Sequence, residues 1–344
     1  MLKSLSLAAL AASVTFALAL AGCGGGSGGG SASSQSASNI KIGFIVKAPD
    51  EPWFQREWHF ADETAAKDGF TVIHAQGQDG EKVSAAIQNL AVQGAQGFVI
   101  CTPDVKLGPA IVAQANQNGM KVIAVDDQFV GADGKPMTNV PYIGIDAKKI
   151  GNLVGQTLME QMKAHKWDMA DTALCAITFE ELPTAKDRTD GAIDACEAGG
   201  LPADQVFKAP MTKSNLEQAK IAATNLHTQH PNVKHWLICG MNDPVVIGGV
   251  RAFEEAGLTA DNIIGVGING DQVAIDELNR PQVTGFYGTV LLSARTHGSN
   301  TVQMMYDWIK DGKTPPMDTR TTGTVINREN FHQVLKEQGV PEKS

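Results

Sequence analysis

Residues 70–101 read FTVIHAQGQDGEKVSAAIQNLAVQGAQGFVIC and contain two short apolar runs on either side of an amphipathic stretch. The runs at residues 70–74 and 97–101 predict strands. Residues 81–92 predict a helix, because their apolar side chains recur every three or four positions. Strand, helix and strand in this order are typical of a unit whose two strands run parallel while the helix covers the sheet.

The same alternation extends over most of the chain. Many of the apolar runs are continuous, which favours parallel strands that are covered on both faces. Further strands are predicted at residues 41–46, 121–125, 142–145, 173–178, 206–209, 235–239, 263–268 and 285–289. Further helices are predicted at residues 150–162, 184–198, 215–227, 243–255 and 293–310. Two sets of about five strands predict two doubly wound parallel-sheet α/β domains.

Length and charge agree with two domains and exclude some partners. The chain has 344 residues, whereas single cores stop growing at about 250–300 residues. It carries 28 basic and 37 acidic residues, a net charge of −9, and shows no basic stripe of the kind that a nucleic-acid-binding protein needs. Apart from Cys23, the cysteines at 101, 175, 196 and 239 lack metal-binding spacing, and three lie in apolar runs. We therefore expect no metal site and mostly free, buried thiols.

The N-terminus has the pattern of an export signal. Lys3 precedes an apolar run, and the run ends at Leu20-Ala21-Gly22-Cys23. This sequence resembles the lipobox of bacterial lipoproteins, which implies that residues 1–22 are removed and that Cys23 carries lipid. An ordinary cleavable signal is the alternative. Residues 24–38, GGGSGGGSASSQSAS, then predict a flexible tether with a mean reach of roughly 20 Å.

Polar side chains follow the predicted strands at their carboxyl ends, where doubly wound sheets bind ligands. They combine amides with charges of both signs, which suits a neutral polyhydroxylated ligand, since each hydroxyl both donates and accepts a hydrogen bond. These residues are Lys47, Glu51, Asp126, Asp127, Arg188, Asn242 and Asn269, and Trp53 adds an aromatic face. Each also fits an ordinary role: Asn242 is a good helix cap, and Arg188 has Asp187 and Asp190 close by for a surface ion pair.

The chain resembles bacterial L-arabinose-binding proteins of the type I periplasmic sugar-binding family from residue 40 to about residue 341. The likeness is carried by VKAPDEPWFQREW (46–58), DGEK (79–82), GFVICTPDVKLG (97–108), KVIAVDDQFV (121–130), HWLICGMND (235–243), GVRA (249–252), IIGVGING (263–270) and TGFYG (284–288). It implies two lobes, one of residues 40–145 plus 291–321 and the other of residues 146–290 plus 322–344, after a tether at 23–39. Three crossovers would join the lobes, which would close around one sugar.

The resemblance also implies a binding site and partners. The first lobe would contribute Lys47, Glu51, Trp53, Phe54, Cys101, Asp126, Asp127 and Ile145, and the second would contribute Leu182, Thr184, Arg188, Met241, Asn242 and Asn269. Trp53 would stack on the sugar, one aspartate would bind the anomeric hydroxyl, and Arg188 would reach the ring oxygen. The partners would be L-arabinose or a related monosaccharide such as D-galactose or D-fucose, and the permease of an ABC importer. The protein would act as a monomer, without a cofactor and without catalysis.

The sequence departs from the family pattern at three places. Ile145 stands where a methionine is expected beside the C5 position of the sugar, which leaves the choice between pentose and hexose open. The segment after residue 270 is one residue longer than usual, so either Asp271 or Gln272 takes the polar role there. Leu291 and Leu292 occupy a hinge segment where a proline is usual.

Two other functions fit parts of the sequence. Residues 265–270 match the dinucleotide-binding pattern GxGxxG, which would indicate an NAD-dependent oxidoreductase. However, residues 285–300 contain no acidic residue to hold a ribose at the expected distance. The second alternative is a binding protein of the same fold for another sugar, such as ribose or xylose.

Overall fold

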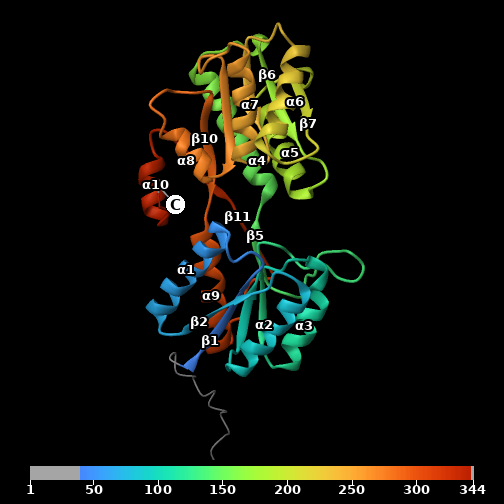
Figure 1. The fold of residues 1–344 in the computed structure, drawn as a ribbon, viewed down its shortest axis with the longest axis vertical. Coiled ribbons are helices and arrows are strands. Elements are labelled where there is room, and N and C mark those ends of the chain that lie inside the picture. Colours follow the sequence, from blue (N-terminus) through green and yellow to red (C-terminus); the bar gives the residue numbers. More distant parts are fainter. Residues whose placement is uncertain (1–38, 342–344) are drawn as a thin grey trace, which may run out of the picture. The chain divides into compact units, whose positions relative to one another are not determined.

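A computed structural model describes residues 39–341, so the predictions for the N-terminal signal, Cys23 and most of the tether lie outside the described residues. Two six-stranded sheets, each with helices on both faces, form the described chain (Figure 1). The predicted class, two doubly wound α/β domains, is thereby confirmed. Among the described residues no helix combines the length and the apolar character needed to cross a membrane.

The first sheet is entirely parallel, with strand order β11-β5-β4-β3-β1-β2. Two layers of helices cover it, so its central strands are buried on both faces (Figure 1). Its strands are β1 (Lys41–Val46), β2 (Thr71–Gln76), β3 (Gly97–Ile100), β4 (Lys121–Val125), β5 (Tyr142–Ile145) and β11 (Asp318–Thr321). Helices α1 (Pro52–Asp68) and α9 (Ala294–Asp311) cover one face, and α2 (Gly80–Val92) and α3 (Gly108–Gln117) cover the other.

The second sheet repeats this plan with strand order β12-β10-β9-β8-β6-β7. Its strands are β6 (Thr172–Thr178), β7 (Val206–Pro210), β8 (His235–Cys239), β9 (Ile263–Asn269), β10 (Phe286–Leu292) and β12 (Gly323–Asn327). Its helices are α4 (Ala147–Ala164) and α5 (Pro183–Ala198) on one face, α6 (Leu216–Gln229) and α7 (Asp243–Glu255) on the other, and the shorter α8 (Gln272–Leu278) and α10 (Phe331–Gln338). Short 3-10 helices lie at Val105–Leu107, Met169–Asp171 and Ala203–Gln205.

Each sheet has six strands, one more than the set of about five that the sequence predicted. Strands β11 and β12 were not predicted, and β12 runs antiparallel to β10. Both lie in DTRTTGTVIN (318–327), which is polar and half-exposed, so it lacks the apolar pattern by which the other strands were found. Their position follows instead from backbone hydrogen bonding to β5 and β10 at the sheet edges.

Within residues 39–341, the chain passes between the two sheets at three places. The first passage follows β5, the second follows β10, and the third joins β11 to β12 through Thr322. All three passages begin at the ends of sheet strands. A conformational change at these strand ends therefore acts directly on the segments that join the lobes.

The four described cysteines are free and buried, as predicted for a protein whose thiols pack as small apolar groups. Burial raises the pKa of the Cys196 thiol to about 12. The thiol therefore stays protonated at neutral pH and is a poor nucleophile.

Candidate functional site

In the first lobe, three predicted site residues meet at the carboxyl ends of β1, β3 and β4. Lys47 Nζ lies 2.5 Å from Asp127 Oδ2, and Cys101 Sγ lies 3.5 Å from the same oxygen. Burial opposes the charge of Lys47, but the neighbouring Cys101 and Asp127 outweigh it and raise the pKa of the ammonium group. Lys47 is therefore charged at neutral pH, and it lies beside Asp127 with both side chains half-exposed.

Asp126 is held by three side chains from different elements. Trp53 Nε1 of α1 donates to Asp126 Oδ2 at 3.1 Å, and His297 Nδ1 of α9 lies 2.6 Å from Asp126 Oδ1. The Tyr142 hydroxyl donates to the backbone oxygen of Asp126 at 2.7 Å. Burial alone would raise the pKa of the Asp126 carboxyl, but the hydrogen bonds and charge of His297, together with Trp53, hold this pKa below its usual value. Asp126 is thus a fixed, ionised acceptor.

Glu57 lies beside Asp126 and His297, one turn after Trp53 on α1. Its side chain is fully buried, and neither carboxyl oxygen has a hydrogen-bond partner among the described residues. Its Oε1 atom is 3.8 Å from His297 Nδ1. Burial, together with the charge of Asp126, raises the pKa of Glu57 well above its usual value. The surroundings of Glu57 therefore favour its neutral, protonated form.

Glu57, Asp126 and His297 bring possible ligand atoms within 4.8 Å of one another. Transition metals require distances of about 2.0–2.2 Å to nitrogen and oxygen ligands. The 2.6 Å contact between His297 Nδ1 and Asp126 Oδ1 is instead a hydrogen bond, which leaves no space for an ion between the two atoms. The arrangement fits a shared proton better than a metal.

In the second lobe, Arg188 joins two of the predicted strand ends. Its Nη1 atom donates to the backbone oxygen of Met241 at 2.6 Å and to Asn269 Oδ1 at 3.2 Å. Arg188 therefore does not form the alternative surface pair with Asp187 or Asp190. Burial lowers the pKa of Arg188, yet a guanidinium remains charged in proteins.

The segment after β9 places an aspartate next to this group. Asn269 Nδ2 donates to Asp271 Oδ2 at 3.2 Å, whereas Gln272 Nε2 donates to Asp276 Oδ1 at 2.9 Å. Of the two residues that the sequence left open, Asp271 is therefore the one that lies in the cluster. Burial raises the pKa of its carboxyl, although Asn269 and nearby arginines oppose this shift.

Behind this cluster, Asp243 and Asn242 hold the start of α7. Asn242 Oδ1 accepts from the backbone N–H of Val245 at 3.2 Å, which makes Asn242 the helix cap that the sequence also predicted. Asp243 is fully buried, and its Oδ2 accepts from the backbone N–H of Asp271 at 2.8 Å. Burial, together with the charge of Asp271, raises the pKa of Asp243 well above its usual value.

Backbone conformation singles out one residue in each lobe. Three non-glycine residues among positions 39–341 have a positive φ, and two of them are Asp126 (62°) and Asn269 (114°). Each stands at the end of a central parallel strand. Left-handed backbone at a residue with a side chain costs free energy and clusters at functional sites, so these two positions support a site at the strand ends.

The other predicted site residues occupy less constrained places. Phe54, in the first turn of α1, is buried in the core, and Ile145 is half-buried as the last residue of β5. Glu51 is exposed just before α1, and Leu182 and Thr184 are exposed at the start of α5. These five side chains stand close to the ends of strands or the starts of helices.

Sequence reasoning missed two buried neighbours of Asp126, His297 and Glu57. His297 is 171 positions away from Asp126 in the chain, and no local motif marks it. Glu57 was read only as part of a matched string, although a glutamate one helical turn after a tryptophan shares its face. Only the packing of α1 against α9 brings these residues to β4.

The glycines of the GxGxxG pattern have a packing role. Gly265 and Gly267 lie inside strand β9 and not in the turn that follows it. A Cβ atom at Gly267 would lie 2.1 Å from Asp243 Oδ1, and one at Gly265 would lie 2.8 Å from the Val250 side chain. The pattern therefore does not form the phosphate-binding turn of a dinucleotide site.

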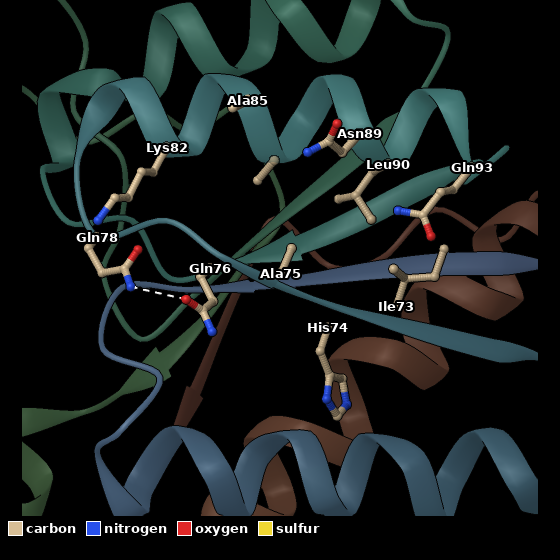
Figure 2. Close-up of a pocket in the computed structure, with 11 residues that line it drawn as sticks. Ile73, His74, Ala75, Gln76, Gln78, Lys82, Ala85, Asn89, Leu90 and Gln93 are labelled. Carbon is tan, nitrogen blue, oxygen red and sulfur yellow. Dashed lines mark hydrogen bonds between the residues drawn. The ribbon is translucent and has the colours of Figure 1, made fainter.

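A separate groove lies on the first lobe between the edge strand β2 and helix α2 (Figure 2). Its volume is about 370 Å³, and its lining includes Gln76, Gln78 and Asn89. Gln78 Nε2 donates to Gln76 Oε1 at 3.2 Å across one end. None of the predicted site residues lines this groove, so it is distinct from the clusters at the strand ends.

Comparisons with known proteins agree with this architecture. The chain is 50% identical over 305 residues to the L-arabinose-binding periplasmic protein of Escherichia coli, covering 88% of this chain and 92% of that protein. It is 46% identical over 301 residues to the ABC transporter L-arabinose-binding periplasmic protein of Azospirillum brasilense, covering 88% and 90%.

Solved structures at low identity share the fold. One is a periplasmic ribose ABC transporter protein of Conexibacter woesei, with a TM-score of 0.71, 20% identity and coverage of 88% of this chain and 96% of that one. Another is an arabinose-binding protein of Geobacillus stearothermophilus, with a TM-score of 0.67, 13% identity and coverage of 86% and 98%. Residues 39–334 match the model of one family, and the chain therefore belongs to the family of periplasmic binding proteins and sugar-binding domains of the LacI family.

Proposed function

We propose that this protein captures L-arabinose outside the cytoplasm and delivers it to an ABC importer. The observation that carries the proposal is the 50% identity, over 305 residues, to a protein named for binding L-arabinose. The strand-end residues described above are compatible with such a ligand.

The chemistry of the two clusters supports a neutral sugar as the ligand. Asp126 and Asp127 offer carboxylate oxygens, which accept hydrogen bonds from hydroxyl groups, while Lys47 and Arg188 offer charged donors. Asn269 offers both a donor and an acceptor. Opposite charges lie close together in the first cluster, where Lys47 pairs with Asp127, so the site does not favour an ion of either sign.

The proposed sugar contacts are those that the family resemblance implies. We assign the binding of hydroxyl groups to Lys47, Asp126, Asp127, Arg188, Asn242 and Asn269, with Trp53 as the aromatic face. Since Trp53 Nε1 donates to Asp126 Oδ2, the indole plane is fixed by the same carboxylate that would bind the sugar. Binding to both lobes would favour the closed form, because a ligand shifts an equilibrium by its difference in affinity between two states.

Titration calorimetry with L-arabinose, D-galactose, D-fucose, D-ribose and D-xylose tests the proposal. We expect L-arabinose to bind tightest. Tight binding of ribose or xylose alone would favour the alternative within the same fold. No heat with any sugar would overturn the sugar assignment, and NAD added in the same series tests the oxidoreductase alternative. We propose a binding role without catalysis, so we expect the sugar to be recovered unchanged.

Discrimination between pentose and hexose is proposed to depend on the end of β5 and on the second crossover. Ile145 is half-buried as the last residue of β5, and Leu292 is 8% exposed as the last residue of β10. D-galactose and L-arabinose, which are both included in the calorimetry, differ by one hydroxymethyl group. Ile145→Met should change the ratio of these two affinities and leave ribose binding unaffected.

We further propose that Cys23 anchors a monomer to a membrane by lipid after removal of residues 1–22, and that the tether allows docking on the permease. Cys23→Ser should release the exported protein from membranes, with Cys196 left intact as the control thiol. Membrane retention of the Cys23→Ser protein would exclude the lipid anchor.

A further inference from the structure

A chain of partly buried hydrogen bonds connects the Asp126 carboxylate with all three segments that join the lobes. His297 Nδ1 contacts Asp126 Oδ1 at 2.6 Å, and His297 Nε2 contacts Thr321 Oγ1 at 2.7 Å. Thr321 Oγ1 in turn lies 3.3 Å from the backbone oxygen of Gly144.

Three residues of this network each lie next to a different crossover between the lobes. Gly144 is the next-to-last residue of β5, directly before the first crossover. His297 lies in the first turn of α9, directly after the second crossover. Thr321 is the last residue of β11, directly before the third. The Thr321 backbone oxygen also accepts from the Asp146 N–H at 2.8 Å, which binds the first and third crossovers to each other.

His297 is built to transmit a displacement. Its side chain is 1% exposed, and both ring nitrogens are engaged. A carboxylate only accepts hydrogen bonds, so the Nδ1 atom that faces ionised Asp126 must carry a proton. The ring cannot rotate without breaking two hydrogen bonds, and a buried ring nitrogen left without a partner is costly. Trp53 packs edge-on to the same ring, with centroids 5.5 Å apart.

We propose that His297 is a positioning residue which couples the Asp126 carboxylate to the hinge, so that sugar binding and lobe closure are linked through His297 and Thr321. This inference rests on the proposed sugar contact at Asp126. If closure tightens the contacts of Asp126 with the sugar, then by thermodynamic reciprocity the sugar must bias the hinge by the same factor.

Thr321→Val is the sharpest test, because it removes one hydroxyl from the middle of the network and leaves Asp126, Trp53 and His297 intact. Thr319→Val is the matched control, since Thr319 lies two residues earlier in β11 and is also half-buried. L-arabinose affinity is measured by calorimetry, dissociation by stopped-flow tryptophan fluorescence, and lobe separation by energy transfer between one dye on each lobe.

We expect Thr321→Val to weaken L-arabinose binding by about three- to ten-fold, the effect of one hydrogen bond. The loss should lie in faster dissociation, and the sugar-free distribution of lobe separations should also shift. Thr319→Val should alter none of these. In the double variant with His297→Gln, the Thr321 effect should vanish because the network is already cut, whereas independent structural effects would add.

Four outcomes decide the matter. A Thr321→Val protein that melts earlier but keeps wild-type affinity and lobe distribution overturns the inference, as does full additivity with His297→Gln. Failure of the wild-type protein to bind L-arabinose overturns the proposed function instead, and the sugar-free lobe distribution then still decides whether Thr321 acts on the hinge. Weaker L-arabinose binding, a shifted distribution of lobe separations and non-additivity with His297→Gln together support the coupling of Asp126 to the hinge.

Discussion

His297 Nδ1 of α9 lies 2.6 Å from the Oδ1 atom of Asp126, which directly follows β4. The contact fixes the carboxylate of a residue whose backbone is already held in the left-handed region, with a φ of 62°. A side chain held by its backbone and by two hydrogen-bond donors loses little further freedom when a ligand binds, and such preorganisation favours affinity.

Asp126→Asn should reduce L-arabinose binding by about 2–5 kcal/mol, the usual cost of removing one partner from a buried charged group. An amide has one acceptor oxygen, so either Trp53 or His297 must give up or reverse its hydrogen bond. Calorimetry measures the loss. The control is Asp133→Asn, because Asp133 is exposed and accepts a hydrogen bond from the Lys135 N–H at 3.1 Å, which an amide oxygen can also accept. Unchanged affinity in Asp126→Asn would remove Asp126 from the proposed site.

Arg188→Lys should weaken sugar binding by about 1.5–3 kcal/mol while leaving the fold intact. The guanidinium bridges the Met241 backbone oxygen and Asn269 Oδ1, and a single ammonium group on a flexible stem cannot reproduce that planar geometry. Calorimetry again provides the measurement. Arg280→Lys serves as the control, since Arg280 is exposed just after α8. Equal affinities for both variants would show that charge alone matters at position 188.

Glu57→Gln should reduce the loss of stability at alkaline pH. Burial raises the folded-state pKa of Glu57 above its value of about 4.3 in the unfolded chain. Its contribution is therefore complete below that unfolded pKa and is lost as the pH rises through the folded pKa. The neutral amide avoids this loss.

Urea unfolding at about pH 5 and about pH 9 tests the Glu57 prediction. The free energy of unfolding of the wild-type protein should fall relative to that of Glu57→Gln as the pH increases. Some of the slope should remain in the variant, because Asp243 also has a pKa raised by burial. Parallel pH profiles for the two proteins would mean that Glu57 is already ionised in the folded state.

Gly267→Ala should destabilise the second lobe by about 1–3 kcal/mol, because the added Cβ would overlap buried Asp243. Thermal and urea unfolding measure the change. In Gly80→Ala the nearest atom would be Leu107 Cδ2 at 3.4 Å, and alanine at this position in α2 should be neutral or slightly stabilising. If Gly267→Ala were as stable as the wild-type protein, the packing role of this glycine would be wrong.

The sequence was informative wherever local pattern and burial agree. The strands at residues 41–46, 121–125, 142–145 and 235–239 were predicted with their observed bounds, because each is an apolar run long enough for one buried strand. It failed for residues 318–327, where edge strands are polar and held by backbone hydrogen bonds. It also left Asp271 and Gln272 open, because that choice depends on which side chain turns toward Asn269.

The sequence by itself determined the two α/β domains and the order of their strands along the chain, since apolar periodicity is a local property. It also placed Lys47, Asp126, Asp127 and Asn269 at strand ends and Arg188 on the helix that follows residues 173–178. Only the tertiary structure decided the partners of these residues. The proton between His297 and Asp126, the buried acid of Glu57 and the link through Thr321 join segments that are far apart in sequence. Such contacts arise from packing helices α1 and α9 onto one sheet, and no local pattern encodes them.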